Sequence, residues 1–463
     1  MHIQSFINAE LQKSKTSIVK LNPFTGDPLH QTDSIEVMQI IQAIQGAQRA
    51  FSEWKDSKIE LRIQLLQNIK KVLNVRGEEF ARLEAVDQGL PLRFTLAHNI
   101  QACVDTIDRC IQELTDFQDS NKQKFSGLGV ISLIVSWNLS LRIVFERLIP
   151  ALAAGNAVLV KMSSNSPITG FILAELLKAV DCPKGLVQII HSNQQEIKDL
   201  LVTHPSIKAS SFVGSLKNSS DVLKKVSQLS ANQFKKLQIS SGSKNTAIAL
   251  TPPDDQVFQQ ILDSFMFGQG QLAWNSNRLF ILEKYEKQWV DKLSTYLNNL
   301  KPSKGIEDLS LWGPCLRQAS FDHFSEIENL AKADQAQLIQ SSRILSEQEK
   351  KCFLRPTFTK DMSNCSTLQQ DQIPAPLFIL SVVKYPFDIA KYSNVSYYGQ
   401  SAHIWGEESK IEKIADQLEV AQICKNKWSV QIHTPNQGVK QSAYGFQDYR
   451  VFGGFYSNVK NLT

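Results

Sequence analysis

A polar turn in the middle of the chain, GQLAWNSNRLFIL (270–282), separates an apolar helical stretch from a β-rich run. Gly270 allows the chain to turn, and Arg278 opens the run of strand-forming residues. Covalent catalysis would need a nucleophile here with a base beside it. Ala273 and Trp274, which face the centre of the turn, supply no acid, base or nucleophile.

Ser276 carries the hydroxyl of this turn and is its one possible nucleophile. An alcohol becomes a useful nucleophile only when a base removes its proton. The neighbouring residues Asn275 and Asn277 are amides and offer no base. We therefore interpret Ser276 as a residue that satisfies local hydrogen bonds of the turn.

The cysteines form an odd and scattered set without a C-x-x-C pair, at positions 103, 110, 182, 315, 352, 365 and 424. Their number and spacing indicate neither a disulfide framework nor a zinc site. We expect buried or unreactive thiols and no structural metal.

The chain has 463 residues, more than the roughly 250–300 at which a single core stops growing, so two or three packed units are expected. It carries 50 basic and 45 acidic residues, a net charge of +5 spread over the whole length. That charge is too dilute to indicate nucleic acid or a membrane as a partner. The amino terminus lacks a basic segment followed by an apolar run, and no apolar stretch approaches 18 residues. We expect a cytoplasmic protein.

The elements around the turn follow an alternating pattern. Two amphipathic helices are predicted over 34–54 and 58–75, where apolar residues recur every three or four positions. Beyond residue 127, β-rich runs alternate with helical patterns: strands at 129–135, 157–161, 186–190 and 210–213, and helices near 142–153, 167–180, 194–203 and 219–231. This alternation predicts an α/β fold with a mostly parallel sheet and helices on both faces. Ligands of such sheets bind beyond the carboxyl ends of the strands.

A second α/β series begins near residue 237. It has predicted strands at 236–239, 245–250 and 278–282, helices at 255–267 and 286–298, a loop over 300–314, and further strand-type runs within 377–405. We therefore expect two α/β units joined near residue 240.

Several motifs, in this order along the chain, together resemble those of the aldehyde dehydrogenase superfamily: NPFTGDPL (22–29), AQRAFSEW (47–54), SWNLSL (136–141), PALAAGNAVLVKMSSNSP (150–167), FVGS (212–215), KKLQISSGSKN (235–245) and LRPTF (354–358). The resemblance covers nearly the whole chain. It implies two α/β domains with mostly parallel sheets and a small oligomerisation extension. The expected parts are a Rossmann-like nucleotide-binding domain over 1–240, with a shortened oligomerisation hairpin near 113–127, a catalytic-type domain over 241–430, and a carboxyl-terminal return with an oligomerisation strand over 431–463.

The chemistry of that family uses a cysteine thiolate, an amide and a backbone N–H that stabilise the oxyanion, and a glutamate that activates water. By resemblance, the oxyanion asparagine is retained as Asn138. The segment GQLAWNSNR matches the family's G-Q-x-C-x-x-x-x-R without a gap and places Ala273 at the cysteine. Ser240 stands at the glutamate of L-E-L-G-G, and Gln447 stands where another family carboxylate would lie.

The resemblance also implies a site for NAD or NADP. Lys161 occupies the position of the lysine after the second strand, and Gly214 and Ser215 form the turn that approaches the pyrophosphate. Ser164 replaces the acid that often contacts the adenine ribose, which removes repulsion toward a 2′-phosphate. Gln372 replaces the glutamate that holds the nicotinamide ribose.

These replacements favour a non-catalytic homologue that keeps the scaffold and a possible nucleotide site. Two alternatives stay open: an active oxidoreductase that uses another constellation, and ester hydrolysis through Ser240 or Ser276. By resemblance we expect a homodimer, with a protein partner or an active relative as a further possibility.

Overall fold

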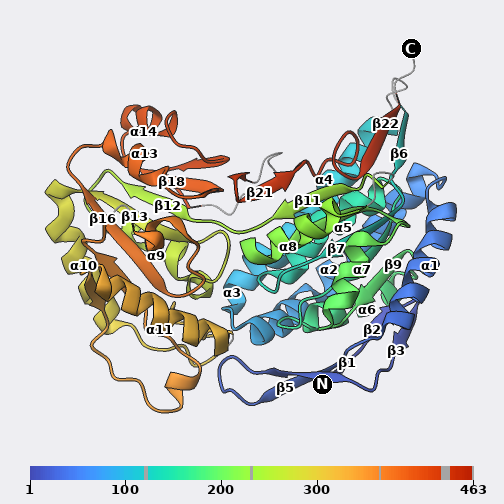
Figure 1. Ribbon diagram of the computed structural model, residues 1–463, viewed down its shortest axis with the longest axis horizontal. Helices are drawn as coiled ribbons and strands as arrows, with labels where there is room; N and C mark the ends of the chain where they lie inside the picture. The colour runs from blue at the N-terminus through green and yellow to red at the C-terminus, as the bar shows by residue number, and fades with distance from the viewer. Residues whose placement is uncertain (119–123, 230–232, 317, 364–365, 429–437, 461–463) are drawn as a thin grey trace.

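The computed structural model describes residues 1–463 apart from 119–123, 230–232, 317, 364–365, 429–437 and 461–463. Its two large sheets occupy two lobes, and residues 236–249 run from one lobe into the other (Figure 1). The α/β fold with two mostly parallel sheets that the motifs predicted is confirmed by this arrangement.

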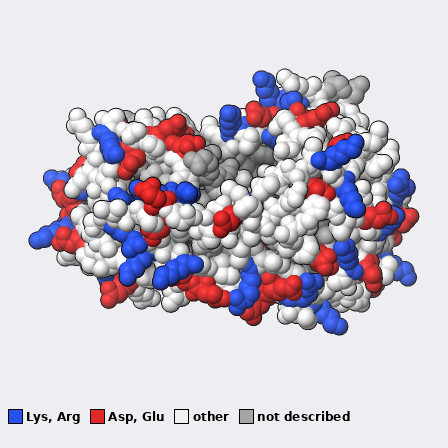
Figure 2. All heavy atoms as spheres, turned by 90° about the horizontal axis from the view of Figure 1, so that it is seen from below, with Lys and Arg blue, Asp and Glu red and all other residues white. Residues whose placement is uncertain are grey.

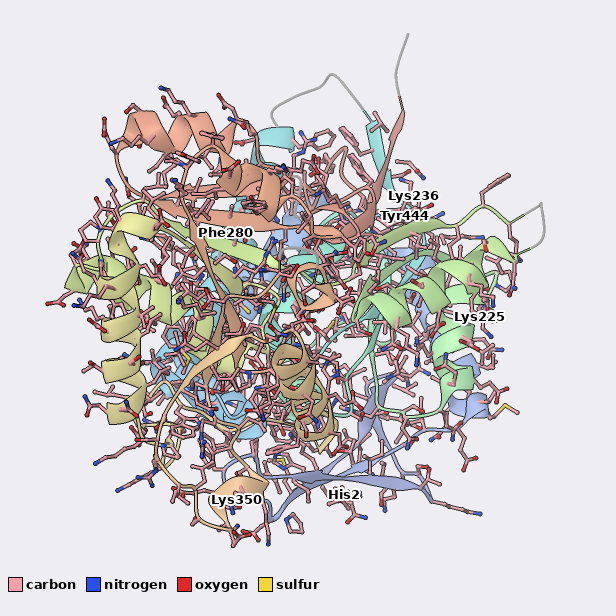
Figure 3. The ribbon with its side chains drawn as sticks, turned by 60° about the vertical axis from the view of Figure 1, so that its left-hand side comes forward. His2, Lys225, Lys236, Phe280, Lys350 and Tyr444 are labelled. Carbon is pink, nitrogen blue, oxygen red and sulfur yellow. The ribbon has the colours of Figure 1, made fainter. Side chains whose placement is uncertain are left out.

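The first lobe is built on an eight-stranded sheet whose five central strands, β11 to β9, are parallel. In spatial order its strands are β21 (Ala443–Gly445), β11 (Lys236–Ser240), β10 (Ile207–Val213), β7 (Val130–Ile134), β8 (Ala157–Lys161), β9 (Val187–Ile190), β2 (Ser5–Ile7) and β3 (Glu10–Gln12). The four strands predicted between 129 and 213 are the four strands β7 to β10. Chain segments far apart in sequence meet at the edge, where Tyr444 of β21 pairs with Ile239 beside Lys236 (Figure 3).

Helices cover both faces of this sheet. They are α1 (Val37–Trp54), α2 (Ile59–Gln88), α3 (Leu92–Thr95), α4 (Gln101–Gln118), α5 (Ser140–Ala153), α6 (Ile168–Ala179), α7 (Gln195–Thr203) and α8 (Leu216–Ser227). Right-handed crossovers place α5 and α6 on one face, because the chain moves outward from β7 through β8 to β9. The return from β9 to β10 places α7 on the opposite face, where it contacts α1.

The second lobe holds a seven-stranded sheet, parallel apart from its edge strand β14. Its order is β14 (Gln337–Gln340), β15 (Thr357–Lys360), β16 (Leu377–Val383), β13 (Ser276–Leu282), β12 (Asn245–Ala249), β18 (Ser401–Trp405) and β19 (Gln422–Lys425). The helices of this lobe are α9 (Asp255–Met266), α10 (Glu286–Asn299), α11 (Gln318–Ala333), α12 (Thr367–Gln370), α13 (Asp388–Ser393) and α14 (Glu408–Ala415).

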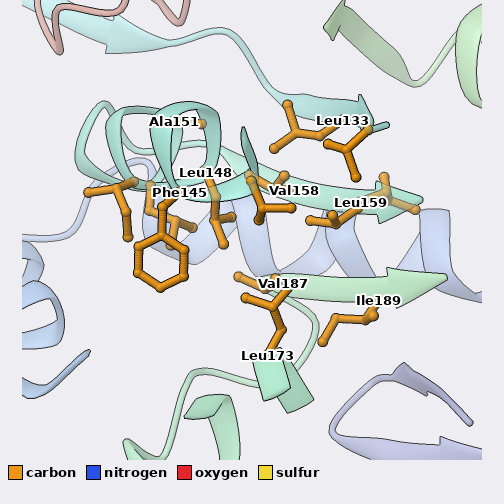
Figure 4. Packing of buried hydrophobic residues seen from close by; sticks show 14 of the residues in the cluster. Leu133, Phe145, Leu148, Ala151, Val158, Leu159, Leu173, Val187 and Ile189 are labelled. Carbon is orange, nitrogen blue, oxygen red and sulfur yellow. The ribbon is translucent and has the colours of Figure 1, made fainter. Parts of the chain in front are cut away.

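The core of the first lobe lies between α5 and the sheet. Phe145, Leu148 and Ala151 of α5 pack beside Val158 and Leu159 of β8 (Figure 4). Every residue of α5 is buried, so this helix is fixed on all sides. Side chains at its amino end are therefore held firmly against the neighbouring loops.

Small sheets complete the fold. The amino-terminal segment forms a three-stranded sheet of β1 (His2–Ile3), β5 (Pro28–Asp33) and β4 (Ser17–Leu21). Strand β17 (Tyr398–Gly399) pairs with β20 (Val439–Lys440), and β6 (Lys124–Gly127) pairs antiparallel with β22 (Ser457–Lys460).

The hairpin expected near 113–127 needs correction. Residues 113–118 continue helix α4, residues 119–123 lie outside the described part, and β6 pairs with β22 instead of with a preceding strand. Helix α4 continues because its apolar residues keep the helical period, with Ile107, Cys110 and Leu114 all buried. Part of the carboxyl-terminal segment 431–463 also joins the first sheet as β21.

One helix and one strand have other bounds than the sequence predicted. The second helix runs to Gln88 instead of 75, and Gly89 ends it in the left-handed conformation at φ 66°. Strand β13 begins at Ser276, two residues before Arg278, which is buried inside the strand.

On the face of the molecule that Figure 2 shows, charged side chains of both signs are interspersed. Among the described residues, no helix is both long and apolar enough to cross a membrane.

Candidate active site

The order of the first sheet reverses at β7, which lies between β10 and β8. Loops that leave the carboxyl ends of two such strands diverge and leave a crevice between them. The loop after β7 contains Asn138, and the loop after β10 contains Gly214 and Ser215. Ser240, the last residue of β11, is the third part of the first lobe that lies at this crevice.

The second sheet faces this crevice with the amino ends of its strands. Gly242 precedes β12, Ala273 precedes β13, Gln372 precedes β16 and Gln400 precedes β18. One lobe therefore offers residues that follow strands, and the other offers residues that precede strands.

Both sets of residues line one cavity of about 160 Å³. Six predicted site residues share its wall: Asn138, Gly214, Ser215, Ser240, Ala273 and Gln372. Lys161 and Ser164 do not line it. The remaining wall includes Glu146 and Arg147 from α5, which the motifs did not indicate.

The turn around Ala273 is fixed by side-chain hydrogen bonds. Asn275 Nδ2 donates to the carbonyl oxygens of Ser264 (3.0 Å) and Phe267 (2.9 Å), and its Oδ1 accepts from Leu272 N–H (2.8 Å). Gly270 adopts φ 68°, and a Cβ there would lie 2.6 Å from the carbonyl oxygen of Ala375, so only glycine fits. The turn keeps a defined shape and presents a methyl group to the cavity.

Asn138 lines the cavity, and its amide has one hydrogen-bond partner in the described part of the chain. Its Oδ1 accepts a hydrogen bond from Ser136 Oγ at 2.6 Å, which orients the amide. The side-chain NH₂ group has no hydrogen-bond partner in the described part of the chain. It can donate to an oxygen atom of a ligand in the cavity.

Ser240 lies beside Arg147, which cannot act as a base toward it. Arg147 Nη2 lies 3.4 Å from Ser240 Oγ and 2.9 Å from the hydroxyl of Tyr449. Burial raises the pKa of Tyr449, so the phenol keeps its proton. Neither the guanidinium nor the protonated phenol can accept the Ser240 proton, as ester hydrolysis requires.

Ser276 does have a possible base, contrary to the sequence interpretation. His403 Nδ1 lies 3.4 Å from Ser276 Oγ, although 127 residues separate them. Neither residue lines the cavity, and both are almost completely buried. A substrate in the cavity therefore does not reach this pair.

Lys161 and Ser164 lie at the end of β8 and in the loop that follows, where the adenosine half of a nucleotide is expected. The Lys161 ammonium donates to the Met162 carbonyl oxygen at 3.2 Å. Burial, and to a smaller extent Lys198, lowers the pKa of Lys161 to about 8. In the described part of the chain, Lys161 has no ion pair with a carboxylate.

Gln372 and Gln447 have local partners. A Cβ on Gly242 would lie 2.2 Å from Gln372 Oε1, so the amide packs directly against that glycine. Gln447 Nε2 donates to the carbonyl oxygens of Ile239 (3.0 Å) and Tyr444 (2.9 Å), and it holds β21 beside β11. Gln447 does not line the cavity.

No thiol among the six described cysteines lines the cavity. Burial raises the pKa of Cys110, Cys182 and Cys315 to about 12, which disfavours the reactive thiolate. Cys365 lies outside the described residues.

Known proteins resemble this chain over nearly its whole length. The sequence profile described as the Aldehyde dehydrogenase family matches residues 10–462. The human 2-aminomuconic semialdehyde dehydrogenase is 24% identical over 486 aligned positions, which cover 100% of this chain and 98% of the relative.

Solved structures give the same fold. An aldehyde dehydrogenase from Bartonella henselae superposes with a TM-score of 0.91 at 19% identity, covering 99% of each chain. An indole-3-acetaldehyde dehydrogenase from P. syringae has a TM-score of 0.89 at 21% identity, covering 99% of this chain and 96% of that one. That protein carries alanine in place of a cysteine and is in complex with NAD+ and IAA.

The chain belongs to the aldehyde dehydrogenase family. Its relatives in this comparison are dehydrogenases.

Proposed function

We propose that this chain is a non-catalytic member of the aldehyde dehydrogenase family that acts by binding a ligand in the cavity. The observation that carries the proposal is the position of Ala273, which lines the same cavity as Asn138. A covalent route requires a nucleophile at this wall. Loss of a covalent nucleophile typically costs about four to six orders of magnitude in rate.

The second support comes from Ser240. A thioester intermediate needs an activated water for its hydrolysis, and a carboxylate normally removes the proton. Ser240 faces Arg147 and Tyr449 instead, so this step also lacks its base. Both half-reactions are impaired together.

We further propose that the crevice still accepts NAD or NADP. Gly214 and Ser215 line the cavity, and the Ser215 side chain caps α8, where free N–H groups favour phosphate. Ser164 and Lys161 place no carboxylate near the expected 2′-phosphate, so NADP should bind at least as well as NAD. The alanine-substituted relative in complex with NAD+ supports the view that this fold holds the nucleotide without the thiol.

A thermal-shift titration with NAD and NADP tests nucleotide binding. A ligand present at a hundredfold over its Kd adds about 2.7 kcal/mol to stability, a readily measured shift. The same preparation is then assayed for NADH or NADPH formation from aldehydes and for hydrolysis of an activated ester. We expect a thermal shift and neither activity. Reduced nucleotide would favour the alternative oxidoreductase, and ester hydrolysis without nucleotide would favour the serine-based alternative.

We propose that the protein works in the cytoplasm as a homodimer or paired with an active relative. The strand pair β6–β22 supports an oligomerisation role, since it stands at the edge of the first lobe (Figure 1). Phe117 and Phe125 pack there with Phe452 at ring-centroid distances of 4.1 to 5.2 Å. Analytical ultracentrifugation tests this proposal, and a monomer at micromolar concentration would contradict the homodimer.

A further inference from the structure

Helix α5 begins two residues after Asn138, and side chains from other helices cap its first turn. The residue directly before the helix, Leu139, has no polar side chain and cannot act as a cap. The first N–H groups of a helix have no partner within it and must be satisfied elsewhere. Three of them find acceptors on α2 and on the π-helical turn η1 (Leu96–Ile100): Leu139 N–H donates to Gln88 Oε1 (2.9 Å), Leu141 N–H to Glu84 Oε1 (3.2 Å) and Arg142 N–H to Asn99 Oδ1 (2.7 Å).

The three capping side chains belong to one buried hydrogen-bond network. Asn99 Nδ2 and Thr169 Oγ1 both donate to the Glu84 carboxyl group. Thr169 Oγ1 lies 3.1 Å from Ser166 Oγ, which accepts from Gln88 Nε2 at 3.1 Å. All five residues are at most 1% exposed. Because each side chain is held by its neighbours, the network fixes the start of α5 in one place.

Two uncommon backbone conformations meet at this network. Leu139 adopts the left-handed conformation, at φ 54° and ψ 47°, and is fully buried. This conformation is unfavourable for a residue with a Cβ, so the surrounding contacts must hold it. Asn99 lies in the π-helical turn, a rare conformation that is frequent at functional sites. Gln88 and Asn99 therefore support the strained segment from two different helical elements.

Asn138 lies between two points that these contacts hold. On its carboxyl side, Gln88 accepts from Leu139 N–H. On its amino side, Ser140 Oγ donates to the Ser136 carbonyl oxygen (2.8 Å), and Ser136 Oγ donates to Asn138 Oδ1 (2.6 Å). The backbone and the amide of Asn138 are therefore anchored from both sides, which restricts the direction of its side chain.

We propose that Glu84, Gln88 and Asn99 are positioning residues of the cavity. They do not line it, and they act through the backbone of α5. By holding Leu139 in its left-handed conformation, they keep the Asn138 amide in the cavity wall as a donor to a bound ligand. A donor is most effective when its direction is fixed before the ligand arrives. This inference rests on the proposed ligand-binding function, because Asn138 serves a ligand of that cavity.

A double-mutant cycle in the Ala273→Cys background tests this coupling. The introduced thiolate attacks p-nitrophenyl acetate, forms a thioester and releases p-nitrophenolate, which is followed by absorbance, and the protein with Ala273 gives the background. Asn138→Ala should slow this acylation about a hundredfold, because a donor to the oxyanion is lost. Gln88→Met, which removes the acceptor and keeps the length of the side chain, should slow it about tenfold. The two substitutions together should slow it no more than Asn138→Ala alone, within about twofold.

Three results of the cycle would overturn the proposal. Losses that multiply in the double variant would show that Gln88 does not act through Asn138. Acylation of Gln88→Met at the rate of its parent, or of Asn138→Ala at the rate of its parent, would remove the effect that the proposal explains.

Gln188→Met is the matched control. Gln188 is also fully buried in the first lobe, where it contacts Asn8 and the Ala43 carbonyl oxygen, and it does not line the cavity. In the Ala273→Cys background it should be acylated within about twofold of the parent rate. A loss equal to that of Gln88→Met would reduce the role of Gln88 to general packing and overturn the proposal.

A second measurement decides the proposal if Ala273→Cys is not acylated. The side-chain NH₂ signals of Asn138 are recorded by NMR in protein labelled with ¹⁵N-asparagine and are assigned by their loss in Asn138→Ala. They should shift or broaden in Gln88→Met and stay as in the wild type in Gln188→Met. Unchanged signals in Gln88→Met would overturn the proposal.

Hydrogen exchange of the wild-type protein decides the proposal if Gln88→Met does not fold. The N–H groups of Leu139, Leu141 and Arg142 should exchange as slowly as those in the middle of α5, because all three have buried acceptors. Exchange at the rate of exposed amides would overturn the proposal.

Failure of the proposed function is detected separately. Aldehyde turnover by the wild-type protein would contradict the non-catalytic function, whereas the cycle and the NMR signals report only whether Gln88 acts through Asn138. The two failures are therefore distinguishable.

Discussion

Ser243 Oγ donates a hydrogen bond to the carbonyl oxygen of Ala273 at 2.5 Å. Asn245 Nδ2 donates to the same oxygen at 2.9 Å. These two contacts hold the turn against the segment that connects the two lobes, independently of the side chain at 273. A cysteine introduced at 273 would therefore occupy a defined place in the wall of the cavity that Asn138 also lines.

Ala273→Cys alone should not restore steady-state turnover. The new thiol can form a thioester with an aldehyde and bound NAD, but Ser240 provides no base for its hydrolysis. We expect an acyl adduct by mass spectrometry and a steady-state rate at least about a hundredfold below that of Ala273→Cys/Ser240→Glu. Sustained formation of NADH by the single variant would show that another group activates water.

Nucleotide binding should weaken as pH rises through 8. Lys161 has its pKa lowered to about 8 by burial and Lys198, so its ammonium loses its proton between pH 7 and 9. The Kd for NADP should increase about tenfold over this range at constant ionic strength. Lys161→Met should bind more weakly and without this pH dependence, while Lys178→Met, on the exposed part of α6, should behave as wild type. An unchanged wild-type Kd would contradict the role of Lys161.

Arg278→Met should destabilise the second lobe by about 3 kcal/mol. Arg278 Nη2 donates to the carbonyl oxygens of Lys244 (3.0 Å) and Ser393 (2.9 Å) and to Thr246 Oγ1 (2.9 Å), and methionine removes this donor from all three acceptors. The midpoint of urea unfolding measures the loss. Arg76→Met, which removes an exposed pair with Glu79, should cost less than about 1 kcal/mol. A loss as small as that of the control would contradict this role for Arg278.

Protonation of His191 should oppose folding at acidic pH. Burial and Lys161 lower its folded-state pKa to about 3, below the value of about 6.5 in the unfolded chain. The unfolded state then binds more protons between these two values, so stability is full above pH 6.5 and falls as pH decreases toward 3.

His191→Gln should reduce this slope by up to about 1.4 kcal/mol per pH unit, measured by urea unfolding between pH 6.5 and 5. His323→Gln, on the exposed face of α11, is the control substitution. If the two variants share the wild-type slope, His191 is not responsible for it.

Local patterns predicted most elements but not their full extent. Helix α2 continues to Gln88 through Glu84 and Asp87, which are buried and interrupt the apolar period. Gln88 Oε1 accepts from Leu139 N–H, and Glu84 Oε1 accepts from Leu141 N–H, more than 50 residues away. A sequence pattern does not reveal such tertiary partners. The predicted end of this helix therefore came too early in the chain.

Sequence patterns likewise predicted only some of the residues of the candidate site. The motifs predicted that Asn138, Ser240 and Ala273 belong to one site, and all three line the same cavity. Each lies at the end of a strand or in a loop next to one. Glu146 and His403 were missed, since their importance arises from contacts across the fold. One signal was present: Arg142, Glu146 and Arg147 place three charged residues in a helix that is otherwise mostly apolar.

The pairing of β21 with β11 has a consequence for biosynthesis. Ser442 lines the cavity, and Tyr449 reaches Arg147 across 302 residues. During synthesis on the ribosome, the edge of β11 therefore stays unpaired until residues 443–445 have emerged, although β11 itself is made about 200 residues earlier. A prematurely terminated chain exposes that edge to other strands, so an incomplete product is prone to aggregate and does not form the finished cavity.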